Sequence, residues 1–430
     1  MSGAAAPTVA PSLGDRFVGR KYVQLVLLLG ALTAIGPLTV DTYLPALPTL
    51  RQELHATDAG AQLTMTGLLA GLGLGQLIIG PLSDSVGRRK PLIAGLVGHA
   101  LMSVLCALAP SIEMLIIART VQGLCGAAVA VVAMAIVRDL FSGMKAAQLL
   151  SRLVLVTGVS PILAPSLGSA LLSLTDWQGI FVVLAAVALG AMVIAIVALP
   201  ETLPPVRRVP AEPVRWLQAY GALFGDRRYL TMVAVAAMMF AALFAYVAGS
   251  PFVLQDVYGL SPASYGVVFA INAVGLIVLT QLNPLLVKRF GPEAVLRGAV
   301  IAGVASAVAL LVTSLSGGGL LGFVVPIFVL LAACGVSAPN AAAIALSRHG
   351  ESAGTASALL GSAQFVIGGF ASPIVGALNN GTAVPLAALM IFSTGVALAL
   401  LLRLSRSSRR APRPLVEDQS GGAFQRESAG

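Results

Sequence analysis

Long apolar runs, separated by shorter polar segments, recur from one end of the chain to the other. Twelve runs have the approximate limits 22–46, 60–82, 91–110, 112–138, 148–172, 179–199, 229–254, 262–287, 296–314, 320–346, 353–378 and 383–403. Each is long enough for a helix to cross the apolar core of a bilayer, which takes roughly 20 residues at about 1.5 Å per residue. The pattern therefore predicts an all-α membrane protein with twelve transmembrane helices.

The composition excludes an ordinary soluble domain, because 57% of the 430 residues are hydrophobic and only 10% are charged. Of the 26 lysines and arginines, 24 fall in the tails and in the loops of one side. Arg51 lies on the other side and Arg119 lies within a span. Since basic loops stay in the cytoplasm, we expect both termini there, in a bacterial inner membrane. The net charge of +9 then reflects topology, and no nucleic-acid partner is expected.

A polar stretch between the sixth and seventh runs divides the chain into two halves. The predicted parts are a cytoplasmic tail (1–21), an N-terminal six-helix bundle (22–199), a cytoplasmic central loop (200–228), a C-terminal six-helix bundle (229–403) and a disordered cytoplasmic tail (404–430).

Local patterns recur between the halves at offsets of 204 to 209 residues. The matched sets are Gly80, Leu82 and Gly87 with Pro284, Leu286 and Gly291; Pro45 with Pro251; Pro165 and Gly168 with Pro373 and Gly376; and Cys125 and Gly126 with Cys334 and Gly335. These matches indicate two pseudo-symmetric bundles, an arrangement that places a substrate site between the halves.

One acid stands apart from the other carboxylates. Of the 17 acidic residues, 16 fall in loops, tails or span ends, and Asp41 is the exception. A carboxylate that alternates between wet and dry surroundings can take up and release a proton. Residue counting places Asp41 and Arg119 at similar depth, so we hypothesise that they pair directly or through water and that protonation of Asp41 releases Arg119. Binding of the substrate would compete with the proton. The alternatives are an interfacial carboxylate for Asp41 and a purely structural role for Arg119.

The segment between the second and third runs resembles motif A of the major facilitator superfamily. It contains Gly80, Asp84, Gly87, Arg88 and Arg89 and lies in a predicted cytoplasmic loop, as that motif requires. An acid and clustered guanidinium groups at adjoining helix ends can form charge-assisted hydrogen bonds, a conformational latch that holds one state and breaks in another. The alternative is that these basic residues only set topology. In the second half, Lys288 replaces the acid and Pro292 the first arginine, so a latch there must differ.

Two further segments narrow the resemblance. Residues 41–48 and 249–262 are similar to those of Bcr/CflA drug-resistance transporters, and the likeness covers nearly the whole chain. The resemblance implies a drug:proton antiporter, with phenicol and bicyclomycin-type antibiotics among the substrates of relatives. Arg119, Gln122 and Gly123 resemble the antiporters' motif B, whose arginine is implicated in proton transfer. Gly158, Pro165 and Gly168 resemble motif C, although Ala164 and Ser169 stand where that motif usually has glycines, and packing alone also explains them.

The proton chemistry is expected only in the first half, because Val247 occupies the position equivalent to Asp41. The second half would mainly shape the cavity. Candidate lining residues offer aromatic faces or neutral hydrogen-bonding groups within apolar helices, with helix packing as the alternative for each: Tyr43, Phe240, Tyr246, Gln255, Asn272, Asn340 and Gln364.

These patterns predict proton-coupled efflux of small lipophilic drugs by alternating access. The alternative is a proton-linked exporter or importer of an endogenous metabolite on the same fold. An enzyme is not expected, because the sequence has no Walker A, HExxH or Ser/His constellation. We expect no metal and no cofactor other than the proton gradient, and a monomer whose partners are the drug, protons and the bilayer.

Overall fold

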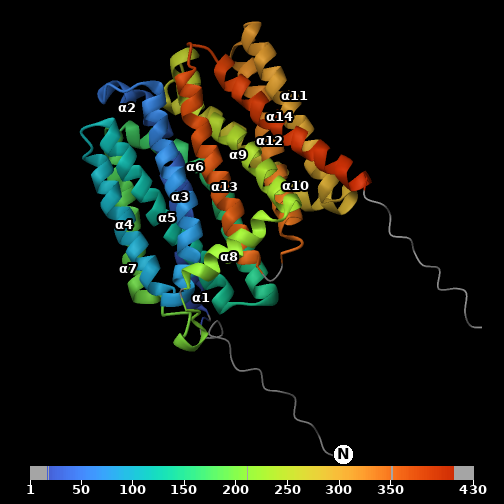
Figure 1. Ribbon diagram of the computed structural model, residues 1–430. Coiled ribbons are helices and arrows are strands. Elements are labelled where there is room, and N and C mark those ends of the chain that lie inside the picture. Colours follow the sequence, from blue (N-terminus) through green and yellow to red (C-terminus); the bar gives the residue numbers. More distant parts are fainter. Residues whose placement is uncertain (1–16, 18, 211, 350–351, 411–430) are drawn as a thin grey trace, which may run out of the picture.

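The computed structural model describes residues 17, 19–210, 212–349 and 352–410. Twelve of its helices are long and apolar enough to cross a membrane, as the hydrophobic pattern predicts. Within the described residues, every regular element is helical. The helices form two packed groups, with α3 and α13 side by side between them (Figure 1).

The first half contains α1 (Arg20–Asp41), η2 (Leu44–Ala46), α2 (Leu47–Glu53), α3 (Asp58–Val86), α4 (Arg89–Ala107), α5 (Ile112–Leu140), α6 (Gly143–Leu172) and α7 (Trp177–Ala198). The second half contains α9 (Arg227–Pro251), η4 (Phe252–Val257), α10 (Pro262–Phe290), α11 (Pro292–Leu315), α12 (Gly319–Leu346), α13 (Ala353–Ala377) and α14 (Val384–Arg410). Contacts of α3 with α13 and of α6 with α10 join the two halves.

Helix ends in both halves follow from local chemistry. The Thr57 hydroxyl accepts the backbone N–H of Gly60 at 3.0 Å and so caps the start of α3. Asp226 caps α9 in the same way, accepting N–H groups of the first turn. At the far ends of α3 and α10, Gly87 and Gly291 have φ of 98° and 78°, a region that favours glycine. These two glycines are equivalent in the predicted repeat, so the duplication extends to backbone geometry.

The first and seventh spans are broken near the matched prolines, which the apolar pattern does not show. After Asp41 the chain passes through the short helix η2, and after Pro251 it continues as the π-helical segment η4. A proline lacks the N–H that a continuous α-helix needs, so a break beside it is expected physically. Both spans therefore extend further than predicted, to Glu53 and Val257.

Two other boundaries differ from expectation. The central segment contains an additional helix, α8 (Pro213–Phe224), which is too short and too polar for a search based on membrane thickness. The last helix, α14, continues to Arg410, so the tail predicted to be disordered from residue 404 is wrong for 404–410. Residues 411–430 of that predicted tail lie outside the described part of the chain.

Candidate functional site

The two ends of the molecule differ in how the halves meet. We call the end where α3 ends and α4 begins the basic end, and the end that carries α2 and η4 the opposite end (Figure 1). At the opposite end, Arg51 of α2 contacts Asp58 of α3 at 2.5 Å and Asp256 of η4 at 3.1 Å. Asn379, just after α13, donates a hydrogen bond to Asp58. Charged groups from both halves thus form one bridged cluster, which we call the Arg51 bridge.

Further hydrogen bonds close the same end. The Gln62 amide of α3 donates to the carbonyl of Ala248 at 3.3 Å and accepts the N–H of Gly376 at 2.9 Å. Gln255 donates to the carbonyl of Pro45 at 3.1 Å, and Ser169 donates to that of Pro262 at 2.7 Å. Each of these bonds crosses from one half to the other, so the halves are tied together here.

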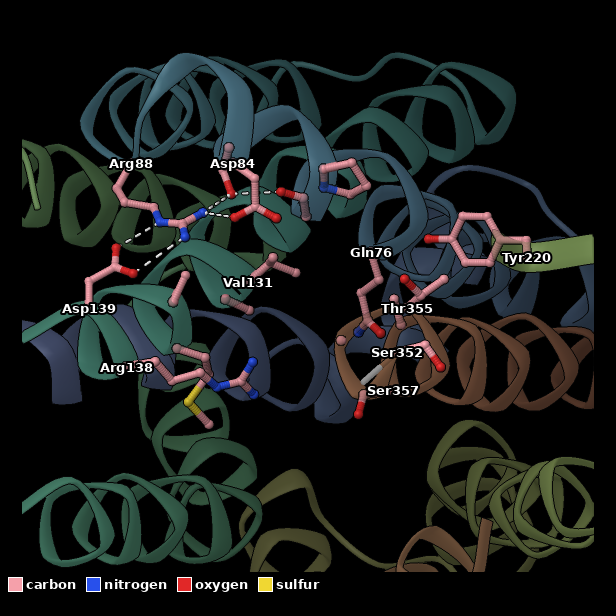
Figure 2. A pocket seen from close by; sticks show the side chains of 18 residues that line it. Gln76, Asp84, Arg88, Val131, Arg138, Asp139, Tyr220, Ser352, Thr355 and Ser357 are labelled. Atoms are coloured by element: carbon pink, nitrogen blue, oxygen red, sulfur yellow. Dashed lines mark hydrogen bonds and ion pairs between the residues drawn. The ribbon is translucent and has the colours of Figure 1, made fainter. Parts of the chain in front are cut away.

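At the basic end a cavity of about 570 Å³ separates the halves. Figure 2 shows Gln76 of α3 next to Ser352 and Thr355 of the second half, with Val131 and Arg138 of α5 across the cavity from them. Tyr220 of α8 lies at the margin of the cavity and donates a hydrogen bond to the carbonyl of Leu77 at 3.1 Å. The molecule is therefore closed at one end and hollowed at the other.

Arg88 is the centre of a charged cluster on the first-half wall of this cavity (Figure 2). Its guanidinium contacts Asp84 at 2.5 Å and Asp139, in the last turn of α5, at 2.8 Å. Burial works against the charge of Arg88, but the hydrogen bonds to Asp139 and Asp84 outweigh it and raise its pKa above the ordinary value. The motif A residues thus form charge-assisted hydrogen bonds of the predicted kind, within one half. Arg89 donates instead to the carbonyl of Ile196 at 2.6 Å.

The central segment is attached to the same cluster. The Glu201 carboxylate accepts the backbone N–H groups of Arg88 at 2.8 Å and Arg89 at 3.3 Å, and Thr202 donates to Asp139 at 3.1 Å. Burial opposes the charge of Glu201, but these hydrogen bonds, a further N–H from Leu203 and the nearby Arg208 lower its pKa. Gly87 suits this position because its φ of 98° favours glycine and because it leaves room for the Glu201 carboxylate, which would lie 2.6 Å from a Cβ.

Asp41 lies at the end of α1, just before the break in the first span. Its residue surface is only 6% exposed, and within the described residues no hydrogen-bond donor or cation contacts its carboxylate. Asp41 lies three residues before η2, and η2 contacts α9 and α10 of the second half. A carboxylate buried in this way is costly in its charged form.

Arg119 of α5 is fully buried and has different partners from the predicted one. Both of its terminal nitrogens donate to the Thr39 carbonyl of α1 at 3.1 Å, and one also donates to Gln122 at 2.9 Å. Its guanidinium lies 4.1 Å from the ring centre of Tyr43. Among the described residues, Arg119 and Asp41 make no direct contact in this conformation, and the pairing of deprotonated Asp41 with Arg119, directly or through water, stays a prediction.

The remaining motif residues have distinct surroundings. Gln122, which accepts a hydrogen bond from Arg119, also donates one to the Ser103 hydroxyl at 2.7 Å. Gly123 lets α5 approach α3, since a Cβ on it would lie 2.0 Å from the Leu68 carbonyl. Gly168 has the same role toward the Thr42 carbonyl, at 1.8 Å, as expected for close helix contact. For Gly158 that expectation is wrong, because a Cβ there would meet nothing within 4 Å among the described residues. Pro165 lies inside α6.

None of the seven predicted cavity residues lines the cavity at the basic end. Tyr43 and Tyr246 are fully buried, and Tyr246 accepts a hydrogen bond from Asn272 at 3.0 Å. Asn340 is bonded to Asn283 at 2.6 Å, and Gln255 belongs to the closed opposite end.

Phe240 packs against Phe244 and Phe365, with ring centres 4.7 and 5.3 Å apart. Gln364 is half-buried in α13. In this conformation most of these seven side chains therefore pack between helices, which was the alternative to lining the cavity.

Several residues of these clusters were missed by sequence reasoning. Asp58, Asp139, Glu201 and Asp256 were grouped with the acids of loops and span ends, and Gln76 was not considered. Each acid stands within two residues of the end of a helix or helical segment, or just outside it, so its position alone carries no sign of its partners.

Twelve membrane-spanning helices in two halves, tied at one end and separated by a cavity at the other, define the architecture of an alternating-access membrane transporter. Residues 27–373 match the family model described as Major Facilitator Superfamily, and the chain belongs to that family. It is a multi-pass membrane transporter and not an enzyme.

Relatives match along most of the chain. The MFS-type transporter YdgK of Bacillus subtilis is 38% identical over 384 residues, which cover 88% of this chain and 94% of that protein. A bicyclomycin resistance protein homolog of Haemophilus influenzae is 30% identical, covering 87% and 93%. The multidrug resistance protein MdtL of Vibrio parahaemolyticus is 26% identical, covering 87% and 94%.

Solved structures show the same fold at low sequence identity. A point mutant of the nucleoside transporter NupG superposes with a TM-score of 0.69 at 14% identity, covering 90% of this chain and 99% of that one. The xylose transporter XylE of E. coli, in a partially occluded inward open conformation, gives 0.68 at 14% identity, covering 92% and 98%.

Proposed function

We propose that this transporter exports small lipophilic drugs, such as phenicol or bicyclomycin-type antibiotics, in exchange for protons. It would act as a monomer in a bacterial inner membrane, with both termini in the cytoplasm. Relatives named for bicyclomycin and multidrug resistance support the drug class. The distribution of basic residues supports the orientation, because 24 of 26 fall on one side. With the basic end in the cytoplasm, the present conformation faces inward.

The observation that carries the proton coupling is the environment of Asp41. Asp41 is buried, just before the segment η2 that contacts the second half, and no cation or hydrogen-bond donor among the described residues contacts its carboxylate. A proton would remove an otherwise uncompensated charge while the halves pack together around it. Loss of that proton would favour a state in which the site is hydrated or a drug replaces the proton.

Arg119 takes a positioning role in this mechanism. It holds the Thr39 carbonyl and stacks on Tyr43, so it fixes the chain on both sides of Asp41. The motif A cluster and the Arg51 bridge lie at the two ends of the molecule. Alternating access would require the halves to approach at the basic end while the Arg51 bridge breaks.

The test is transport in proteoliposomes with and without an imposed pH gradient, using bicyclomycin and a phenicol as probes. The wild-type protein should accumulate drug against its gradient only when the proton gradient is present. Asp41→Asn should lose this dependence while keeping the unfolding temperature of the wild type. The matched control is Asp176→Asn, an exposed acid at the start of α7 that makes no side-chain cap.

Two results would overturn the proposal. Full gradient-driven transport by Asp41→Asn would exclude this residue as the proton carrier. Unchanged susceptibility of an efflux-deficient host to a panel of antibiotics on expression of the wild type would argue against drug export and favour an endogenous metabolite.

A further inference from the structure

A second cavity, of about 1030 Å³, lies between α1 and α7 in the first half and shares no residue with the cavity between the halves. Its apolar lining comes from membrane-spanning helices. Leu27, Val193 and Val197 of this lining are 67%, 54% and 82% exposed. Apolar side chains this exposed on transmembrane helices face lipid. The cavity is therefore a groove on the membrane-facing surface, which we call the α1/α7 groove.

Polar residues are found only toward the basic end of this groove, the level at which headgroups lie. Lys21, Gln24, Glu201 and Thr202 contribute to its lining there. The groove thus has a polar rim and an apolar body, the shape and polarity of a phospholipid.

The charges at the rim do not cancel. Glu201 already accepts backbone N–H groups of Arg88, Arg89 and Leu203 at 2.8 to 3.3 Å, and Arg208 lies 4.0 Å away. Lys21 is exposed, and within the described part of the chain no carboxylate lies within 4.0 Å of its ammonium. The charge left available to a ligand is therefore positive.

A second cation reinforces this potential. The Arg89 guanidinium donates to the carbonyl of Ile196 in the last turn of α7, one residue before Val197 of the groove. Its Nε is buried and has no acceptor among the residues that the structure describes. A cation that donates to a neutral carbonyl keeps its full charge close to the rim.

We propose that the α1/α7 groove binds one anionic phospholipid, with its phosphate at Lys21 and an acyl chain along the side chains of α1 and α7. A basic pocket between transmembrane helices at headgroup level has the chemistry that selects an anionic lipid over a zwitterionic one. The lipid would be a structural ligand of the first half. The proposal is independent of the transported substrate and of proton coupling.

The experiment measures lipid retention by purified full-length protein in a neutral detergent, using native mass spectrometry after exchange into phosphatidylglycerol or phosphatidylcholine. The wild type should retain phosphatidylglycerol several-fold better. Lys21→Ala should reduce this preference to near unity, and Lys21→Arg should keep it. The matched control is Lys288→Ala, a lysine at the basic end of α10, away from the groove, which should behave as wild type.

A second variant tests the groove without changing its charge. Val193→Trp should lower retention of both lipids, because the indole would occupy the groove from a lipid-facing position that tolerates bulk. An unchanged preference in Lys21→Ala, or unchanged retention in Val193→Trp, would overturn the site. Displacement of phosphatidylglycerol by millimolar inorganic phosphate would show that Lys21 binds phosphate alone, and would also overturn it. None of these three outcomes depends on transport, so a failure of the lipid-site proposal leaves the proposed drug export untouched.

Discussion

The Arg51 bridge makes a quantitative prediction about conformational equilibrium. Asp256→Asn removes the charged contact of 3.1 Å that joins η4 to α2, while Arg51 keeps Asp58 at 2.5 Å within its own half. The variant therefore weakens a bond between the halves without leaving an arginine unpaired. We expect it to shift the protein toward states in which the opposite end is open.

The size of the shift follows from exposure and geometry. The side chains of Arg51 and Asp256 are 22% and 35% exposed. Fully exposed ion pairs contribute roughly 0.2–1 kcal/mol, and hydrogen bonds to charged groups contribute about 1.5–3 kcal/mol when buried. A pair that is about one quarter to one third exposed and keeps a neutral hydrogen bond as asparagine should lose about 1 kcal/mol, which changes a two-state ratio about fivefold.

Distances between spin labels at the opposite end would measure this ratio. Labels at Thr175 and Ser316, exposed positions in different halves, would report opening in a background without the native cysteines. Asp256→Asn should increase the population of long distances about fivefold, and the increase should shrink at high salt, which screens the wild-type pair. Asp176→Asn serves as the control. Equal distributions in the wild type and in Asp256→Asn would refute the assignment of this bond as a conformational constraint.

Three other outcomes are expected. Gly168→Ala places a methyl group 1.8 Å from the Thr42 carbonyl, so it should destabilise the fold by about 1–3 kcal/mol and lower the unfolding temperature. The control Gly158→Ala, at a position with open space around it among the described residues, should leave the unfolding temperature unchanged. Equal effects of the two substitutions would contradict the packing argument. Above about pH 4.5, Glu201→Gln should unfold at a lower temperature than the wild type. This difference in unfolding temperature should disappear as the pH falls through the lowered pKa of Glu201. A difference that does not depend on pH would rule out an electrostatic cause. Arg119→Lys retains the charge but loses the forked contact with the Thr39 carbonyl, so stability should fall by about 1–3 kcal/mol, and an unchanged thermal melt would show that the fork is dispensable.

The hydrophobic pattern predicts the twelve spans because bilayer thickness sets a minimum length for every crossing. It does not predict α8, since a helix of 12 residues that does not cross the bilayer has no such constraint. The breaks after Asp41 and Pro251 are partly predictable from the sequence. Their prolines are visible in the sequence, but whether a proline kinks, ends or tightens a helix depends on its neighbours.

The partners of the charged residues could be predicted from the sequence only where they belong to one local segment. Counting residues along α1 and α5 places Asp41 and Arg119 at similar depth. Counting gives no relative rotation of the two helices, and rotation directs Arg119 to the Thr39 carbonyl. Motif A predicts the acid beside Arg88, because both belong to one local segment. The second acid, Asp139, is 51 residues away and enters only through tertiary packing.

The attachments of the central segment shorten the free connection between the halves. Glu201 and Thr202 are bonded to the first half, and Tyr220 of α8 is bonded to α3. Asp226 begins α9 and contacts His349 of the second half at 3.1 Å. Because α8 continues to Phe224, only Gly225 lies between this helix and Asp226, which caps α9. The covalent connection between the bundles is therefore a short pivot. It keeps the two bundles together and limits the amplitude of their relative rotation by chain length as well as by contacts.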